Sequence, residues 1–304
     1  MLQVLIVGDR ESGKTTFLTL LYAASVKSGS DKADEFRFHA PIESMETASI
    51  LFQQLMAGAF PDAVTKQGID ALTLHIGSGR SRGGVLSRLR GRGAPGALSE
   101  LRFSRLGALD EELPQMLKGS VTAMGGWKNI LDSHVVTMIV DSTKLAAKVE
   151  GPGPSPMSGY DASAETLLTA IQRLRQRDDR RLVYPVFAFS KFDRVKPDVL
   201  QAAKVGSAPP PVGDRGRAAY AEALLGPNMP KTLALVRGRE KEGPRFAKCA
   251  YFFSWVRTES APPGRADRIR LRRGELSGWE PEYPRQEYLA FLGYLEDIAS
   301  RTGE

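Results

Sequence analysis

The sequence has almost none of the residues that form disulfide bonds and zinc sites. Among its 304 residues there is one cysteine, Cys249, which excludes a disulfide bond within the chain and is typical of a reducing compartment. The three histidines, His39, His75 and His134, lie far apart and lack the spacing of metal ligands. We therefore expect neither a disulfide-stabilised scaffold nor a zinc site.

Long hydrophobic runs are missing as well. No apolar run approaches the roughly 18 residues that a membrane-spanning helix needs, so we expect no transmembrane segment. The fractions of hydrophobic residues, 42%, and of charged residues, 25%, are those of a soluble globular protein with a full core. The net charge of +7 permits contact with nucleic acid, acidic lipid or an acidic protein, but it requires none of them.

The most informative stretch is residues 8–15, GDRESGKT. It follows an apolar run at 4–7 and precedes residues 16–22, whose apolar positions have helical spacing. A strand, a glycine-bounded loop, Lys-Thr and a helix, in this order, make up a phosphate-binding loop. The loop begins where a signal peptide would have to lie, which favours a cytoplasmic protein.

Each part of this loop has a chemical purpose. Gly8 and Gly13 allow backbone angles and close approaches that a Cβ atom would obstruct. The loop amides and the helix N-terminus point donors at an anion, Lys14 would reach the β- and γ-phosphates, and the Thr15 hydroxyl would ligate Mg²⁺. The residues that we expect to bind the phosphates are Gly8, Glu11, Ser12, Gly13, Lys14, Thr15 and Thr16.

Strand-like and helix-like stretches alternate along the rest of the chain. Strands are expected at residues 36–38, 69–76, 101–103, 135–141, 183–189 and 250–255. Helices are expected at 16–27, 44–56, 109–117, 218–225, 231–236 and 284–300, with one more helix that Asp161 or Ser163 would cap. This order predicts a single α/β domain over residues 1–304, with a mostly parallel sheet, helices on both faces and insertions at about 28–68, 77–97 and 194–246.

Three of these helices carry an apolar stripe that we expect to face the core. The stripes are Met45, Ile50, Leu51 and Leu55 in the first, Leu167, Leu168, Ile171 and Leu174 in the second, and Tyr288, Leu292, Leu295 and Ile298 in the third.

Arginine is concentrated in two stretches. The first holds Arg80, Arg82, Arg88, Arg90 and Arg92, and the second holds Arg265, Arg268, Arg270, Arg272 and Arg273. Either stretch could serve a phosphate-rich partner. The first has no interleaved aromatic residue for base stacking, so we favour a solvated loop there and a polar hairpin for the second. We therefore expect no stable binding to nucleic acid.

Residues 190–193, Ser-Lys-Phe-Asp, follow an expected buried strand. In a chain with a phosphate loop near its start, these four residues resemble the guanine-reading Asn/Thr-Lys-x-Asp motif of a Ras-like G domain in the TRAFAC class of P-loop GTPases. The whole chain is similar in organisation to a prokaryotic subgroup of that class with long insertions. The resemblance implies that Asp193 accepts from guanine N1–H and N2–H₂, that Lys191 lays its stem over the base, and that the backbone near Ser254 contacts the guanine. Ser190 departs from the motif but keeps a small hydroxyl.

The hydrolytic residues of this family are only partly present. The family expects Asp-x-x-Gly after the third core strand; here Gly107 is kept, and its amide would meet the γ-phosphate, but Ser104 replaces the aspartate. The next residue, often a glutamine that positions the attacking water, is Ala108, which cannot position water. The resemblance places the switch threonine that closes over Mg²⁺ at Thr65, with Thr47 and Thr73 worse placed in a helix and a strand.

Arg10 occupies the third position of the loop, which in this family lies near the γ-phosphate and is commonly glycine. A cation there could stabilise transition-state charge as a built-in arginine finger or block a partner's finger. We rank a structural or solvent-facing role above both.

The resemblance therefore implies a GTP-binding molecular switch, with Mg²⁺ as cofactor, that hydrolyses GTP to GDP slowly or with a partner. Candidate catalytic residues are Lys14, Thr65, Gly107 and Arg10, and candidate metal ligands are Thr15 and Thr65. The γ-phosphate would hold segments 57–69 and 104–118, and the family suggests a protein effector or a partner GTPase. The alternatives are a pseudo-GTPase that binds guanine nucleotide as an interaction scaffold, an ATP-dependent enzyme, and a nucleic-acid binder.

Overall fold

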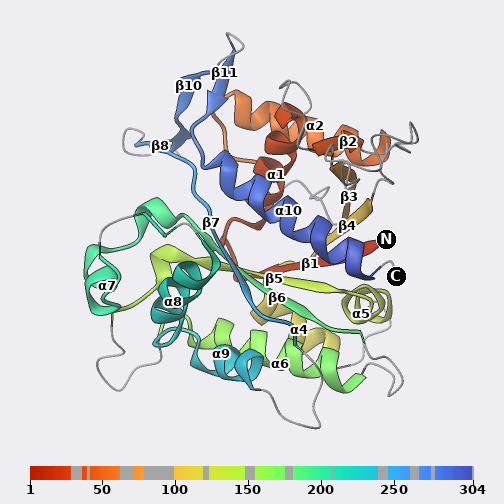
Figure 1. Cartoon of the computed structure of the whole chain (residues 1–304), viewed down its shortest axis with the longest axis vertical. Coiled ribbons are helices and arrows are strands. Elements are labelled where there is room, and N and C mark those ends of the chain that lie inside the picture. The colour runs from red at the N-terminus through yellow and green to blue at the C-terminus, as the bar shows by residue number, and fades with distance from the viewer. Residues whose placement is uncertain are drawn as a thin grey trace, which may run out of the picture. The chain divides into compact units, whose positions relative to one another are not determined.

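The chain divides into two compact units (Figure 1). The computed structural model describes residues 1–28, 36–39, 42–61, 71–78, 99–118, 123–147, 155–174, 181–206, 209–211, 213–238, 246–260, 267–274 and 278–302. The first unit comprises residues 1–2, 15–103 and 256–304, and the second comprises residues 3–14 and 104–255. The expectation of one domain over the whole chain stays a prediction.

The second unit is built on parallel strands. They follow one another across the sheet in the order β1 (Leu2–Gly8), β5 (Val135–Asp141), β6 (Tyr184–Ser190) and β7 (Ala250–Phe253). Val4 pairs with Val135, Val135 with Tyr184, and Val186 with Ala250, all in parallel register. At the far side of β1 lies the carboxyl end of β4 (Ser99–Arg105), where the Leu106 amide donates to the Ile6 carbonyl at 3.0 Å. The predicted α/β class with a parallel sheet is confirmed.

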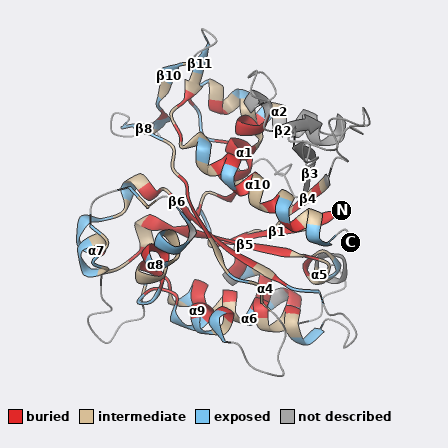
Figure 2. Cartoon of the chain, viewed as in Figure 1, coloured by how far each residue is buried: buried red, intermediate tan, exposed pale blue. Residues whose placement is uncertain are grey.

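Helices of the second unit share one hydrophobic core with these strands (Figure 2). They are α4 (Leu109–Leu117), α5 (Ala123–Leu131), α6 (Ser158–Leu174), α7 (Pro197–Ala202), α8 (Asp214–Leu225) and α9 (Pro230–Arg237). Short 3₁₀ turns, η1 (Ser142–Lys144) and η2 (Phe192–Arg194), follow β5 and β6. Every residue of β5 is buried, as its unbroken apolar run predicted. Packing of this core therefore fixes where the carboxyl ends of the strands and their turns lie.

In its described residues, the first unit combines an antiparallel strand pair, two short two-stranded sheets and three helices. Its elements are α1 (Lys14–Ser28, from Thr15 onward), β2 (Phe36–His39), α2 (Ile42–Met56), β3 (Ala71–Ser78), most of β4, β8 (Thr258–Glu259), β9 (Arg268–Ile269), β10 (Leu271–Arg273), β11 (Trp279–Pro281) and α10 (Arg285–Thr302). Phe17 of α1 packs against Tyr288 and Phe291 of α10, with ring centroids 5.3 and 5.5 Å apart. The predicted stripe on α10 is buried. The hairpin predicted around Ile269 and Leu271 is found instead as two antiparallel pairs, β8–β9 and β10–β11, in which β9 and β10 each pair with a segment outside residues 265–273.

Two apolar stripes are narrower than predicted. Ile50 of α2 is 51% exposed although Leu51 and Leu55 are buried, because neighbouring residues on a helix point about 100° apart. Leu174 is 54% exposed because α6 ends there, whereas Leu167, Leu168 and Ile171 are buried.

The predicted cap of α6 is wrong. The helix begins at Ser158, so Asp161 lies inside its first turn. The buried Asp161 carboxylate instead accepts from the backbone amides of Lys231 (3.1 Å) and Thr232 (2.9 Å), the first turn of α9. A tertiary contact thus caps a different helix, and α5 and α7 were not predicted at all.

None of the helices in the described ranges is long and apolar enough to cross a membrane. The arginine-rich stretch at 80–92 lies outside the described residues, and so does Arg265.

Candidate functional site

The loop at residues 8–14 leaves the buried strand β1 and turns into α1. Gly13 has φ of 89°, in the left-handed region that favours glycine, and Glu11 has φ of 60°. A Cβ atom at Gly8 would lie 2.5 Å from the Ser12 hydroxyl oxygen and 3.3 Å from the Ile139 carbonyl oxygen. Both glycines of the predicted motif are therefore required by the shape of this loop.

Lys14 folds back over the loop that precedes it. Its ammonium group donates to the carbonyl oxygens of Gly8 and Asp9, both at 2.8 Å, and the side chain is buried. The Ser12 amide donates to the Asp9 carbonyl at 3.2 Å and closes a tight turn. The loop thus holds a cation against its own carbonyl groups.

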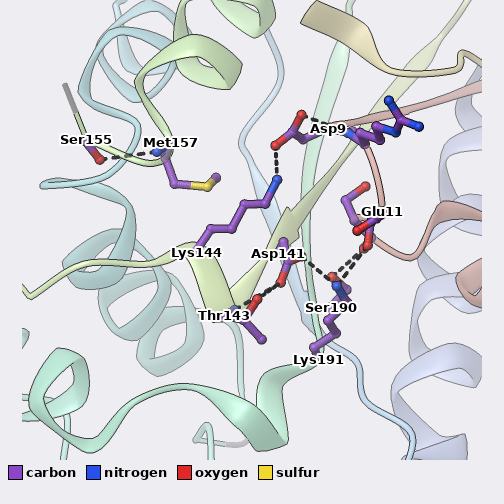
Figure 3. Close-up of polar contacts among 12 residues, drawn as sticks. Asp9, Glu11, Asp141, Thr143, Lys144, Ser155, Met157, Ser190 and Lys191 are labelled. Atoms are coloured by element: carbon purple, nitrogen blue, oxygen red, sulfur yellow. Dashed lines mark hydrogen bonds and ion pairs between the residues drawn. The ribbon is translucent and has the colours of Figure 1, made fainter. Parts of the chain in front are cut away.

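Two further lysines reach the loop from the ends of neighbouring strands (Figure 3). Lys144, in the turn after β5, forms an ion pair with the Asp9 carboxylate. Lys191, directly after β6, donates to the Glu11 carbonyl at 2.9 Å. Because β5 and β6 are parallel, their carboxyl ends deliver both ammonium groups to the same edge of the sheet.

A buried carboxylate holds Lys191 in place (Figure 3). Asp141, the last residue of β5, is 2% exposed, and its Oδ2 accepts from the Lys191 ammonium at 2.7 Å. Its Oδ1 accepts from the Thr143 amide at 3.0 Å and hydroxyl at 2.7 Å. Lys191 has φ of 51°, which costs about 1–2 kcal/mol for a residue with a side chain and persists because these contacts hold it.

The segment at 190–193 is joined to the loop by a second contact. The Ser190 hydroxyl donates to the Ser12 carbonyl at 2.6 Å and lies 3.3 Å from the Val140 carbonyl. A Cβ atom on Gly13 would approach the Ser190 side chain at 3.7 Å. The structure therefore brings together the two motifs singled out in the sequence, residues 8–14 and 190–193.

Ser254 lies beside the same turn. Its amide donates to the Phe189 carbonyl at 2.7 Å, and its carbonyl accepts from the Phe192 amide at 3.1 Å. Asp193, in η2, follows Phe192 and is half-buried. Backbone contacts thus hold Ser254 next to residues 190–193, where the sequence placed it.

Gly107 and Arg10 both face the acidic start of α4. The Gly107 amide donates to Glu112 Oε2 at 2.9 Å, and Ala108 is the residue that precedes the helix. The Arg10 guanidinium lies 3.6 Å from Glu111 Oε1. Ser104, where the family has aspartate, is in strand β4. Arg10 is 75% exposed, in line with the solvent-facing role ranked first.

The proposed metal ligands are less well placed by the structure. Thr65 lies outside the described residues. Thr47 lies in α2 and Thr73 in β3, as expected. Thr15 and Thr16 are the second and third residues of α1, and the Thr15 carbonyl accepts from the Thr19 hydroxyl at 2.8 Å. Within the described ranges, no group of three or more His, Cys, Asp or Glu side chains could hold a metal ion.

Sequence reasoning missed three residues of this site: Asp141, Lys144 and Glu112. The first two begin and end the stretch Asp-Ser-Thr-Lys that follows the buried run of β5. Polar residues at the carboxyl end of a parallel strand are a usable signal for such a site. Glu112 gave no comparable signal, because a glutamate in the first turns of a helix is common.

A buried tyrosine lies beside the end of β1, directly before the loop. The Tyr160 hydroxyl lies 3.5 Å from the Val7 carbonyl, and the residue is 3% exposed. Burial, and to a lesser extent the Asp9 carboxylate, raise the pKa of Tyr160 above its usual range. Tyr160 therefore remains an uncharged hydroxyl beside the end of β1 at any physiological pH.

The single cysteine is expected to be unreactive in the folded protein. Burial raises the pKa of the Cys249 thiol to about 11, and the Tyr251 hydroxyl, which bonds to it, lowers that pKa in part. The thiolate is the nucleophile, and with a pKa of about 11 only about 0.1% of the thiol is ionised at pH 8. We expect iodoacetamide to modify native protein at least tenfold more slowly than urea-unfolded protein, with a rate that rises up to about pH 11. Equal rates at pH 8 would show an accessible thiol instead.

No protein-family model matches the sequence, and no curated protein is significantly similar to it.

Proposed function

We propose that this protein is a GTP-binding molecular switch with slow or partner-dependent GTPase activity. The observation that carries the proposal is that residues 190–193 donate hydrogen bonds directly to the loop at residues 8–14. Lys191 donates to the Glu11 carbonyl, 180 residues away in the sequence, and Ser190 donates to the Ser12 carbonyl. A loop that binds phosphate and a turn that binds a base hold opposite ends of one nucleotide. A rigid connection between them keeps the two half-sites at a constant spacing.

Lys14 is the first residue that we assign to the phosphates. Its ammonium already lies inside the loop, bonded to two neutral carbonyl groups. A phosphate oxygen is a stronger acceptor than a carbonyl because it is charged. Lys14 would exchange one or both of these bonds for bonds to phosphate, while the amides of residues 11–16 donate to the same group.

Asp193 is the residue that we assign to base specificity. A carboxylate accepts from the adjacent N1–H and N2–H₂ donors of guanine, and adenine lacks that pair of donors. Lys191, held by Asp141, would lie along the base, and the backbone at Ser254 would border it. Because Asp141 also orients the turn after β5, base and phosphate recognition share one buried carboxylate.

The residues fit Mg²⁺ only in part. Bound Mg²⁺ would neutralise the charge of the phosphates. Thr15, directly after Lys14, would supply a hydroxyl ligand, as in other phosphate loops of this sequence pattern. Thr65, the second ligand that the resemblance implies, lies outside the described residues and stays a prediction.

The proposed slow hydrolysis follows from Ala108 and from the family's missing aspartate at Ser104. A methyl group can neither orient nor deprotonate water. Arg10 is paired with Glu111 rather than held toward the loop, so it offers no preorganised positive charge. A partner that supplies a catalytic group would therefore raise the rate.

Asp193→Asn is the variant that tests nucleotide specificity. Asparagine presents an amide where the carboxylate accepted two donors, so guanine loses one bond and meets a repulsive donor. We expect the Kd for GTP to rise about 100-fold and the Kd for xanthosine triphosphate to fall about tenfold, as measured by titration calorimetry with Mg²⁺.

Asp198→Asn, on α7 five residues later and exposed, is the matched control and should leave both Kd values unchanged. The proposal is wrong if the wild-type protein prefers ATP and Asp193→Asn leaves ATP binding unaltered. That result would instead favour an ATP-dependent enzyme.

A pseudo-GTPase scaffold is the second candidate, and the contacts of Gly107 and Arg10 favour it. Both groups are engaged by α4 carboxylates, at 2.9 and 3.6 Å. Release of phosphate from bound GTP over several hours separates the two functions. Measurable release, even at a slow rate, supports the switch, whereas guanine binding without any release supports the scaffold.

A further inference from the structure

Two consecutive glutamates near the start of α4 contact a backbone amide and a guanidinium group. Glu112 accepts from the Gly107 amide at 2.9 Å, and Glu111 pairs with the Arg10 guanidinium at 3.6 Å. We call these residues, Glu111 and Glu112, the acidic pair. All four residues belong to the second unit, and Arg10 is itself part of the loop at 8–14.

The Glu112 carboxylate packs directly against Gly107. A Cβ atom on Gly107 would lie 1.8 Å from Glu112 Oε1 and 2.7 Å from its carboxyl carbon. The backbone at Gly107 does not have positive φ, so glycine is not needed there for its conformation. A side chain at this position would require the Glu112 carboxylate to move away from the Gly107 amide.

Carboxylate and phosphate oxygens compete for the same kinds of donor. Backbone amides and guanidinium groups bind either anion through charge-assisted hydrogen bonds, and each such donor serves one anion well at a time. Two carboxylates beside a phosphate-binding loop also repel a third anion that enters it. The acidic pair therefore stands in the way of a phosphate group that approaches Gly107 and Arg10.

We propose that the acidic pair is an internal competitor of the terminal phosphate, and that it sets the preference between nucleoside triphosphate and diphosphate. This inference rests on the proposed function. A diphosphate leaves the contacts of Glu111 and Glu112 in place, whereas a triphosphate has to displace them. The α4 helix thus senses the terminal phosphate, because its first turn must release both donors when that group binds.

Of the two glutamates, Glu112 carries more of the effect. The Arg10–Glu111 pair joins side chains that are 75% and 58% exposed, and such pairs contribute little in water. Glu112 is half-buried, at a shorter distance, and bonded to a backbone amide that cannot turn to another partner. Neutralising Glu112 should therefore change affinity more than neutralising Glu111.

The test compares wild type with Glu112→Gln, Glu111→Gln and the double variant. Glutamine keeps an acceptor for the Gly107 amide and removes the charge, so α4 keeps its N-terminal contact. Kd values for GTP and GDP are measured with Mg²⁺ by titration calorimetry. We expect Glu112→Gln to tighten GTP about tenfold, the double variant somewhat more, and GDP to change less than twofold.

Glu165→Gln, on α6, is the control and should shift neither Kd. An unchanged GTP-to-GDP ratio in Glu112→Gln would show that Glu112 only caps α4 and would overturn the inference. So would a slower phosphate release at unchanged affinity, which would mean that Glu112 positions water. If neither the wild type nor any variant binds guanine nucleotide, the proposed function is wrong, and the inference that rests on it falls with it. Circular dichroism melts confirm that each variant is folded.

Discussion

Replacing Phe189 by alanine is expected to lower the free energy of unfolding by about 3–5 kcal/mol. Phe189 is fully buried in β6; its ring stacks on that of Phe253 at 4.9 Å and meets that of Phe192 edge-on at 6.1 Å. Removing it leaves a cavity between two strands and the turn that holds Asp193. Urea unfolding followed by circular dichroism measures the loss.

Two variants make this result interpretable. Phe189→Leu fills most of the cavity and should cost under about 1.5 kcal/mol. Phe60→Ala removes the same side chain from a position that is 40% exposed, and should cost less than about 1 kcal/mol. If Phe189→Ala and Phe60→Ala cost the same, the packing of β6 against β7 is not what stabilises the second unit.

Replacing Asp141 by alanine is the other change with a large expected effect, about 2–4 kcal/mol on unfolding. The buried carboxylate accepts from the Thr143 amide, the Thr143 hydroxyl and the Lys191 ammonium, and alanine leaves all three without it. The Lys191 side chain is 35% exposed and can turn to water, so the loss falls below that of a fully buried ion pair.

The same variant also tests the contacts between the turn at residues 190–193 and the loop at residues 8–14. Without Asp141, Lys191 loses its ion pair and retains the hydrogen bond to the Glu11 carbonyl, so the proposed nucleotide site should loosen and GTP should dissociate about tenfold faster. Asp141→Asn retains an acceptor for Thr143 and should cost roughly half as much stability. Asp132→Ala, half-buried in the same unit, is the control. Urea unfolding and a stopped-flow release assay with a fluorescent nucleotide provide the two measurements. A stable Asp141→Ala protein with unaltered release would contradict the assigned role.

Much of the second unit was predictable from local pattern. The apolar run at 135–140 leaves no polar face, so it predicts a strand buried on both sides, and β5 has the predicted bounds. The partly acidic stretch at 109–117, predicted to be helical, likewise matches α4 residue for residue. The glycine spacing of residues 8–13 predicted a loop whose backbone needs glycine at both ends, which the φ of Gly13 and the crowding at Gly8 bear out.

Prediction from the local sequence pattern failed where a side chain binds an element that is far away in the sequence. The sequence predicts that Asp161 caps its own helix, yet its carboxylate binds the first turn of α9, 71 residues later. Sequence spacing carries no information about such a distant partner.

The sequence by itself determined the motifs of this protein: the loop at 8–15, the Ser-Lys-Phe-Asp turn at 190–193, and the strands that end at both. Tertiary structure decided how they are joined. Asp141 and Lys191 are 50 residues apart in the chain, and they meet because β5 and β6 pair in parallel register from Val135–Tyr184 to Asp141–Ser190. That register follows from burial of whole strands in a shared core, which is a property of the packed chain and of no single segment.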